Sequence, residues 1–208
     1  MEKHITLPLT EELARTLKAG DMVYLTGTIY TSRDAGHKRM CEALARGEKL
    51  PFDPQDATIY YVGPAPAKPG APIGPAGPTT SYRMDPYTPA LLDAGMVGMI
   101  GKGRRTEPVR EAIVRNGAVY FITIGGAAAL IADSIRSKES VCYEDLGTEA
   151  VCRLEVEDFP AIVIIDSQGN EVPDGSASQR ALEQERADID ATYAVGAPAL
   201  PPSFAPRS

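Results

Sequence analysis

A glycine- and proline-rich stretch, from Gly63 to Asp85, constrains the fold of this chain more than any other feature. Its first eighteen residues, through Thr80, hold four glycines and six prolines. Proline fixes φ and removes an amide donor, whereas glycine permits positive φ and close approach of the backbone. Because a long loop inside a compact domain is usually functional or disordered, we interpret the stretch as a stiff loop that serves a site. A proline-rich linker between two halves of the chain is the alternative.

A group of polar side chains lies at the end of this stretch. The group consists of Thr79, Thr80, Ser81, Arg83 and Asp85. We expect the loop to deliver Thr79 and Arg83 to the site. Since a threonine hydroxyl is a poor acid or base in water, Thr79 could move a proton only where a nearby cation and a shaped pocket alter its acidity.

The overall composition is that of a globular protein. The chain has 208 residues, 43% apolar and 24% charged, enough for one large domain or two small ones. Its net charge of −7 argues against generic nucleic-acid binding, which needs a basic face. The sequence contains neither an apolar run long enough for a membrane span nor an N-terminal signal core. We therefore expect a cytoplasmic protein that binds neither nucleic acid nor membrane.

The three cysteines, Cys41, Cys142 and Cys152, form no CxxC pair. Their odd number and wide spacing fit reduced thiols. The same spacing argues against a zinc or iron–sulfur site held by this chain alone, so we expect no metal ligand here.

Helices and strands alternate in the first part of the chain. The expected elements are a helix from Thr10, a strand or strand pair over 22–32 broken at Gly27, a helix from Asp34 to Arg46, and a buried strand over 58–63. Asp34 is expected to cap the second helix, and Gly47 to end it.

The alternation continues beyond the loop. The expected elements are a helix from Met84, a strand over 97–100, a helix capped by Thr106 and ended at Gly117, a strand over 118–125, a helix over 127–136, and strands over 151–156 and 161–166 followed by a turn at 167–170. The junction at Gly125-Gly126 could hold an anion, although close packing of strand and helix is the more ordinary cause. This order predicts an α/β domain over residues 1–175. Residues 176–208 form a polar, Pro/Ala-rich tail.

His37 lies on the inner face of the second expected helix, since it shares helical spacing with Met40, Cys41 and Leu44. It falls in the first turn, near Arg33. A histidine at such a position can be purely structural, and its closeness to Arg33 favours a place at the edge of a site.

Several cations stand at the ends of elements in an otherwise acidic chain. Arg33 follows a strand, Arg83 follows the loop, Lys102 stands between two glycines after a strand, and Arg104-Arg105 come just beyond. Arginine suits a carboxylate because its planar fork donates two parallel hydrogen bonds. If the fold gathers these cations, they match a dicarboxylate; scattered solvated cations are the alternative.

Three segments carry a resemblance to a known family. The segments TGTIYTSRDAGHKRM, GPAPAKPGAPIGPAGPTTSYRMDPY and GMIGKGRR, in this order, resemble the C-terminal (β) part of class I fumarases and L-tartrate dehydratases, which are iron–sulfur-dependent hydro-lyases. The resemblance covers about residues 5–175. It implies a swivelling β/β/α domain, with a sheet-rich body and packed helices.

The resemblance also implies roles for the matched residues. Arg33, Arg83 and Lys102 would bind the substrate carboxylates, and Thr79 would take part in proton transfer. His37 matches the histidine of the first motif and would lie behind the substrate or at the edge of the site. The family's [4Fe–4S] cluster belongs to the α part.

This chain lacks the α part. We therefore expect a separate β subunit that is silent alone and completes its site with an α subunit, in an α2β2 assembly, although the isolated chain could also self-associate. The expected reaction is reversible hydration of fumarate to (S)-malate. L-tartrate dehydration to oxaloacetate and a non-catalytic dicarboxylate-binding domain are the alternatives.

Overall fold

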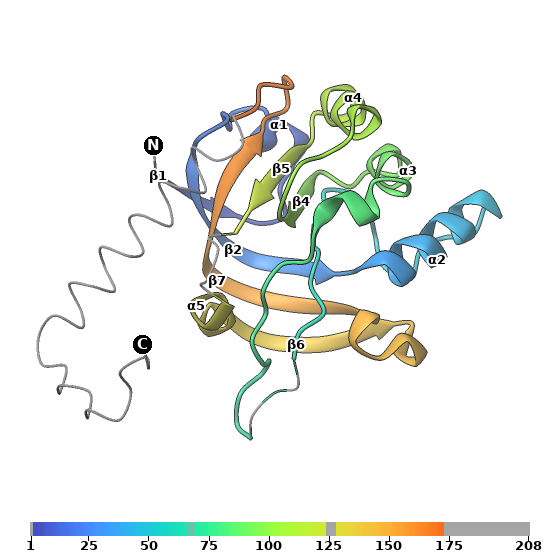
Figure 1. The fold of residues 1–208 in the computed structure, drawn as a ribbon, viewed down its shortest axis with the longest axis vertical. Helices are drawn as coiled ribbons and strands as arrows, with labels where there is room; N and C mark the ends of the chain where they lie inside the picture. The colour runs from blue at the N-terminus through green and yellow to red at the C-terminus, as the bar shows by residue number, and fades with distance from the viewer. Residues whose placement is uncertain (1, 66, 68, 124–127, 173–208) are drawn as a thin grey trace, which may run out of the picture.

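The structure is a computed structural model that describes residues 2–65, 67, 69–123 and 128–172. Its elements, in chain order, are β1 (Glu2–Thr6), α1 (Glu11–Ala14), β2 (Met22–Thr31), α2 (Asp34–Ala45), β3 (Thr58–Tyr60), the 3₁₀ turn η1 (Ser81–Met84), α3 (Thr88–Asp93), β4 (Gly98–Gly101), α4 (Glu107–Asn116), β5 (Val119–Ile122), α5 (Ala128–Asp133), β6 (Ile135–Cys142), the 3₁₀ turn η2 (Glu144–Glu149) and β7 (Val151–Ile165) (Figure 1). Within this part of the chain, no helix is long and apolar enough to span a membrane.

Five strands close into a mixed barrel. β2, β3, β4 and β5 are parallel neighbours in that order, and β7 runs antiparallel to both β5 and β2. β1 extends the sheet beside the first half of β2, and β6 beside the first half of β7. Closure pairs the strands that would otherwise be edges. The expectation of an α/β, sheet-rich body with packed helices is confirmed at this level.

The core has two parts because successive strand residues point to opposite faces. Tyr60 and Phe121 belong to one apolar cluster, together with Leu25, Leu154 and Val163. Their neighbours in the sequence, such as Tyr61 and Tyr120, belong to a second cluster with residues of α2, α3 and α4. These three helices lie along one flank of the barrel in Figure 1. One cluster therefore fills the barrel, and the other joins the barrel to its helices.

Two helix starts differ from the prediction: α3 begins at Thr88 rather than at Met84, and α2 is not capped by Asp34. α4 begins with Pro108 in its first turn and ends at Gly117, which has φ 62°. The prediction that Asp34 caps α2 is wrong: Arg33 is the capping residue, and its side chain makes no capping hydrogen bond. Instead, the carboxylate of Glu149 accepts the N–H of Ala35 at 3.1 Å. A residue far along the chain supplies the cap, which local sequence cannot indicate.

The strand predictions fail mainly in the last third. The two strands expected over 151–166 are one continuous strand, β7. It turns at Asp158, which has φ 50° and donates its N–H to Thr26 Oγ1, and it continues because Phe159 is buried and pairs with Leu25. No strand is predicted over the residues of β6, and the helix predicted over 127–136 ends at Asp133. The Gly125-Gly126 junction and the tail over 176–208 lie outside the described residues.

Candidate functional site

Three neighbouring parallel strands bring the candidate residues to one edge of the barrel. Arg33 follows β2, the Gly/Pro loop follows β3, and Lys102 follows β4. The carboxyl ends of parallel strands meet at one edge, where ligands commonly bind in open α/β sheets. Arg33 packs so closely on the loop that a Cβ at Gly63 would lie 2.6 Å from its Nη1. The first glycine of the loop therefore makes room for an arginine of the site.

The loop is anchored at both ends and in its middle. Its last residues return to the barrel, since Thr79 donates its N–H to the carbonyl of Tyr61 at 2.6 Å. Thr80 forms a parallel bridge with Lys102. In the middle of the loop, Ile73 and Ala76 are buried in the barrel core. The loop therefore leaves one strand and returns beside the next within a single barrel, so the linker alternative is wrong.

Arg83 reaches the N-terminus of α2. η1 directs its guanidinium to Asp34, with which it forms an ion pair. The neighbouring Arg33 lies 3.5 Å from the carboxylate of Glu149. Both candidate arginines therefore lie beside carboxylates of this chain at the start of one helix. Asp34 Oδ1 and Arg33 Nε are buried and have no hydrogen-bond partner in the described part of the chain.

His37 lies near the start of α2 and is fully buried. Its Nδ1 is 2.8 Å from Ser32 Oγ and 3.0 Å from the carbonyl oxygen of Arg33, and its ring meets the edge of Tyr61 at 5.2 Å. Burial lowers the pKa of His37 from 6.5 to about 4, and Arg105 acts in the same direction. Its other nitrogen, Nε2, is buried without a partner among the described residues. His37 is thus a neutral imidazole at neutral pH, in contact with the backbone of Arg33.

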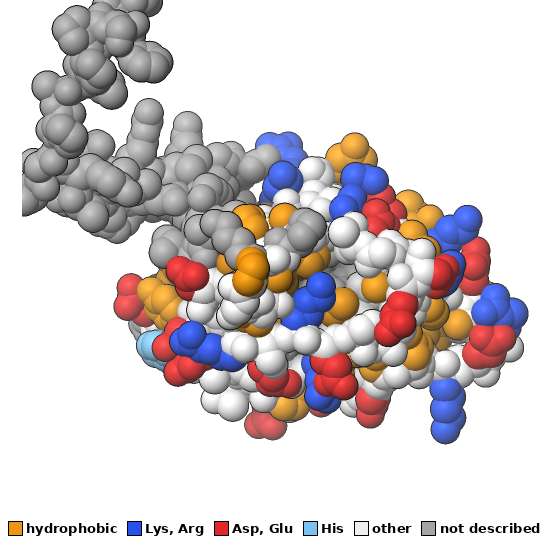
Figure 2. Space-filling view, turned by 90° about the horizontal axis from the view of Figure 1, so that it is seen from below, with side chains coloured by type: hydrophobic (Ala, Val, Ile, Leu, Met, Phe, Trp, Pro, Cys, Tyr) orange, Lys and Arg blue, Asp and Glu red, His pale blue; other side chains and the backbone are white. Residues whose placement is uncertain are grey.

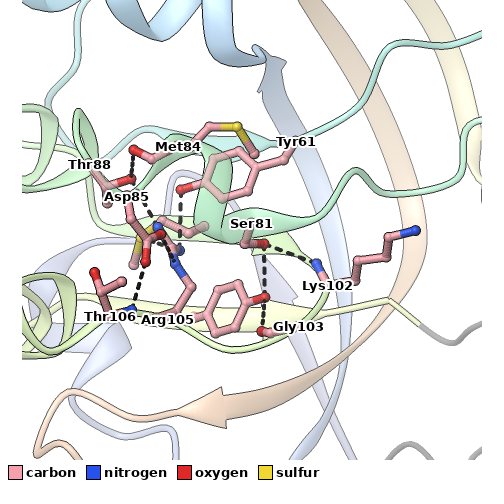
Figure 3. A network of polar contacts seen from close by, with 11 residues as sticks. Tyr61, Ser81, Met84, Asp85, Thr88, Lys102, Gly103, Arg105 and Thr106 are labelled. Atoms are coloured by element: carbon pink, nitrogen blue, oxygen red, sulfur yellow. Dashed lines mark hydrogen bonds and ion pairs between the residues drawn. The ribbon is translucent and has the colours of Figure 1, made fainter.

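Lys102 has an anchored backbone and an exposed side chain. Its N–H donates to Ser81 Oγ at 3.0 Å, and its carbonyl accepts the N–H of Ser81 at 2.9 Å. Figure 3 shows the side chain of Lys102 extending away from the polar network that holds its backbone. The turn therefore presents the ammonium group outward, as expected from the two flanking glycines.

Arg105 is not part of the cationic group, contrary to the sequence prediction. It is buried and forms an ion pair with Asp85, Nε to Oδ1 at 2.8 Å. It also donates to Thr88 Oγ1 at 2.9 Å, and its guanidinium lies over the rings of Tyr61 and Tyr120 at 5.3 and 4.9 Å. The pair joins the end of the loop to α3 and to the strand that precedes α4 (Figure 3).

Sequence reasoning missed this pair as a structural unit. Asp85 stands two residues after Arg83 and Arg105 three residues after Lys102, so the available signal is a pair of opposite charges after two glycine-rich turns. The second oxygen of Asp85 accepts the N–H of Thr106 at 2.7 Å, which places a carboxylate at the start of α4. The pair is therefore fully hydrogen-bonded as well as buried.

Charges of both signs share the molecular surface. On the face drawn in Figure 2, lysine and arginine side chains are interspersed with aspartate and glutamate. This face, among the described residues, carries no broad basic stripe of the kind that binds a phosphate backbone.

The cysteines do not form a ligand set for an iron–sulfur cluster. Cys41 lies on α2, where its thiol donates to the carbonyl of Tyr87 at 3.4 Å, while Cys142 and Cys152 lie on β6 and β7. In the described ranges, no three His, Cys, Asp or Glu side chains come together as metal ligands. The residues present here do not fit a cluster of their own.

Comparison with known proteins agrees with the motifs. A family model described as fumarase C-terminus matches residues 1–174. The chain is 41% identical over 168 residues to the anaerobic class I fumarate hydratase of Escherichia coli, and 43% identical over 149 residues to the mitochondrial fumarate hydratase 1 of Leishmania major. These matches cover 79% and 71% of this chain but only 31% and 27% of the two relatives. The chain thus spans about a third of such fumarate hydratases.

A third relative has nearly the same length. The chain is 39% identical over 170 residues to a putative L(+)-tartrate dehydratase subunit beta of Methanocaldococcus jannaschii, which covers 79% of this chain and 87% of the relative. A match over most of both chains therefore occurs with a relative named as a subunit. Together, these matches show that the chain belongs to the fumarase C-terminal domain family, homologous to class I fumarate hydratases and to the tartrate dehydratase β subunit.

Proposed function

We propose that this chain is the β subunit of a class I fumarate hydratase, which adds water reversibly to fumarate to give (S)-malate. One observation carries the proposal: Arg33, Arg83 and Lys102 come from three separate segments that lie at one edge of the barrel. The chain that carries them is 41% identical to the corresponding part of a fumarate hydratase. A dicarboxylate is the small anion that such a group of cations suits best.

The arginines would bind the two ends of the substrate. Arg83 is nearly half exposed and pairs with Asp34 through one nitrogen, so other N–H groups of its fork can receive a carboxylate. Arg33 is oriented by Glu149 in the same way. The two carboxylates of this chain would thus fix the directions of the guanidinium groups and reduce the freedom lost when substrate binds.

Lys102 and Thr79 would complete this half of the site. The Lys102 ammonium extends from a fixed turn and adds a third positive charge. Thr79 is held by the carbonyl of Tyr61 at the end of the loop, beside Thr80 and the bridge to Lys102. We assign Thr79 the proton transfer at the substrate carbon, and we place His37 behind the arginines as a support for Arg33.

A second chain would supply the rest of the site. We assign the [4Fe–4S] cluster of the family to an α subunit, because the described residues of this chain offer no ligands for it. The near-complete coverage of a relative named as a β subunit supports a separate chain of this kind. We further propose an α2β2 assembly in the cytoplasm, in which this barrel is the swivelling β/β/α domain.

L-tartrate dehydratase is the second candidate, favoured by the 87% coverage of the M. jannaschii relative. Its substrate differs from malate by one hydroxyl group, and the cations described here would bind either. A non-catalytic dicarboxylate-binding domain is the third candidate. It requires that the isolated chain bind a dicarboxylate without any partner.

The test is reconstitution of the chain with its α-type partner and cluster, followed by parallel assays with fumarate and L-tartrate. We expect fumarate hydration by the complex and none by either chain alone. Lys102→Ala should lower the activity at least tenfold, on the order of one lost charge-assisted hydrogen bond. The control is Lys18→Ala, since Lys18 is exposed and precedes β2 at the opposite end of the barrel.

Preference of the complex for L-tartrate over fumarate would replace the leading candidate with the second. Calorimetric binding of succinate to the isolated chain, with an inactive complex, would favour the third.

A further inference from the structure

The Gly-Lys-Gly turn is held by two buried hydroxyl groups. The N–H of Lys102 donates to Ser81 Oγ at 3.0 Å, Ser81 Oγ lies 2.9 Å from Tyr120 Oη, and Tyr120 Oη donates to the carbonyl of Gly103 at 2.8 Å. Ser81 and Tyr120 are fully buried, and Figure 3 shows the side chain of Ser81 directed toward the backbone of Lys102.

The directions of these hydrogen bonds follow from the groups present. A carbonyl only accepts, so Tyr120 must use its proton on Gly103. Ser81 must then donate to Tyr120, and its oxygen accepts the N–H of Lys102. Each hydroxyl therefore donates once and accepts once. Burial raises the pKa of Tyr120 above its usual value, so the phenol keeps its proton.

Glycine is required at the two positions of the turn for different physical reasons. A Cβ at Gly101 would lie 2.0 Å from Ser81 Oγ, so this glycine lets the serine approach the strand end. Gly103 has φ +81°, a conformation that side chains rarely adopt. The Arg105 guanidinium lies over the ring of Tyr120, 4.9 Å from its centroid. The backbone on both sides of Lys102 is thus tied to a rigid, buried unit.

We propose that Ser81 and Tyr120 are positioning residues for Lys102. Both are fully buried and act through the lysine: they fix the backbone from which its ammonium extends to a substrate carboxylate. This inference rests on the proposed function, because Lys102 must contact the substrate for its position to matter.

The test is a double-mutant cycle in the reconstituted complex, with kcat and KM for fumarate as readouts. Tyr120→Phe keeps the ring and removes the hydroxyl, and we expect it to raise KM about five- to tenfold, as one lost hydrogen bond would, with little change in kcat. Ser81→Ala removes the same link at its other end and should give a similar increase. In a Lys102→Ala background, Tyr120→Phe should have no further effect on KM.

A matched control is Tyr60→Phe, which removes another buried tyrosine hydroxyl that donates to a backbone carbonyl, that of Ala76. Its effect should be the same with and without Lys102. An equal KM increase for Tyr120→Phe in both backgrounds would show a merely structural role and overturn the inference alone. An unchanged KM for Lys102→Ala by itself would overturn the proposed substrate contact, and the positioning role with it.

Discussion

Two arginine–aspartate pairs lie near the same edge of the barrel in opposite surroundings. The Arg105–Asp85 pair has side chains 0% and 4% exposed, whereas those of the Arg83–Asp34 pair are 44% and 29% exposed. In the buried pair both carboxylate oxygens accept hydrogen bonds; in the other, Asp34 Oδ1 is without a partner in the described chain. Arg83 and Asp85 are two residues apart, yet they belong to different pairs.

This difference in exposure distinguishes a pair that stabilises the fold from a pair that can bind a ligand. A buried pair is costly to break because the remaining charge is left without compensation. A half-exposed pair contributes little to stability and keeps donors available for a ligand. We therefore assign Arg105–Asp85 to the framework and Arg83–Asp34 to the site.

The largest expected effect is that of Arg105→Ala. It leaves Asp85 buried without its cation, so the free energy of unfolding should fall by about 3–5 kcal/mol. Urea unfolding of the isolated chain measures this change. The control is Arg115→Ala, which breaks an exposed pair with Asp93 and should cost less than about 1 kcal/mol. Equal losses of unfolding free energy in the two variants would show that the Arg105–Asp85 pair does not stabilise the fold more than an exposed pair does.

The next effect is the pH dependence of stability due to His37, which lies between the two pairs and is influenced by both Arg105 and Asp34. Its pKa is about 4 in the folded chain and near 6.5 when unfolded, so between these values the unfolded chain binds the extra proton. Stability from this group is complete above pH 6.5 and is lost as the pH falls toward 4, by about 3 kcal/mol.

Urea unfolding at pH 7 and pH 4.5 measures this loss in the parent chain and in His37→Gln. The variant lacks the titrating group, so it should lose less stability over this range. The same loss in both chains would mean that His37 is not a buried neutral imidazole.

The smallest effect on stability is expected for Arg83→Ala. The pair with Asp34 is partly exposed and screened by solvent, so the free energy of unfolding should change by less than about 1 kcal/mol. A loss comparable to that of Arg105→Ala, measured under the same conditions, would place Arg83 in the framework instead.

The sequence predicts where the candidate residues lie better than it predicts which charged residues belong among them. The two cations at strand ends, Arg33 and Lys102, and the loop that carries Arg83 follow from hydrophobic patterns and glycine positions. The burial of Arg105 does not, because Arg104 and Arg105 are adjacent and equivalent to any local rule. Arg105 is set apart by contacts distant in sequence, with Asp85 and with the rings of Tyr61 and Tyr120.

The errors in the sheet have the same origin. β6 has five consecutive exposed residues, so no alternation marks it, and its pairing with β7 defines it as a strand. β7 continues past Asp158 because β2 pairs with it on both sides of the turn. The capping of α2 by Glu149 also joins residues far apart in the chain. Long-range pairing decides each of these features.

The most direct test of the central claim is fumarate hydration by the reconstituted complex with Arg83→Ala, beside the urea unfolding of the same variant. We expect the activity to fall by about a hundredfold or more, on the order of one lost bidentate charge-assisted contact, while stability stays within about 1 kcal/mol of the parent. Full activity of the Arg83→Ala complex would contradict the assignment of this edge of the barrel as half of the active site.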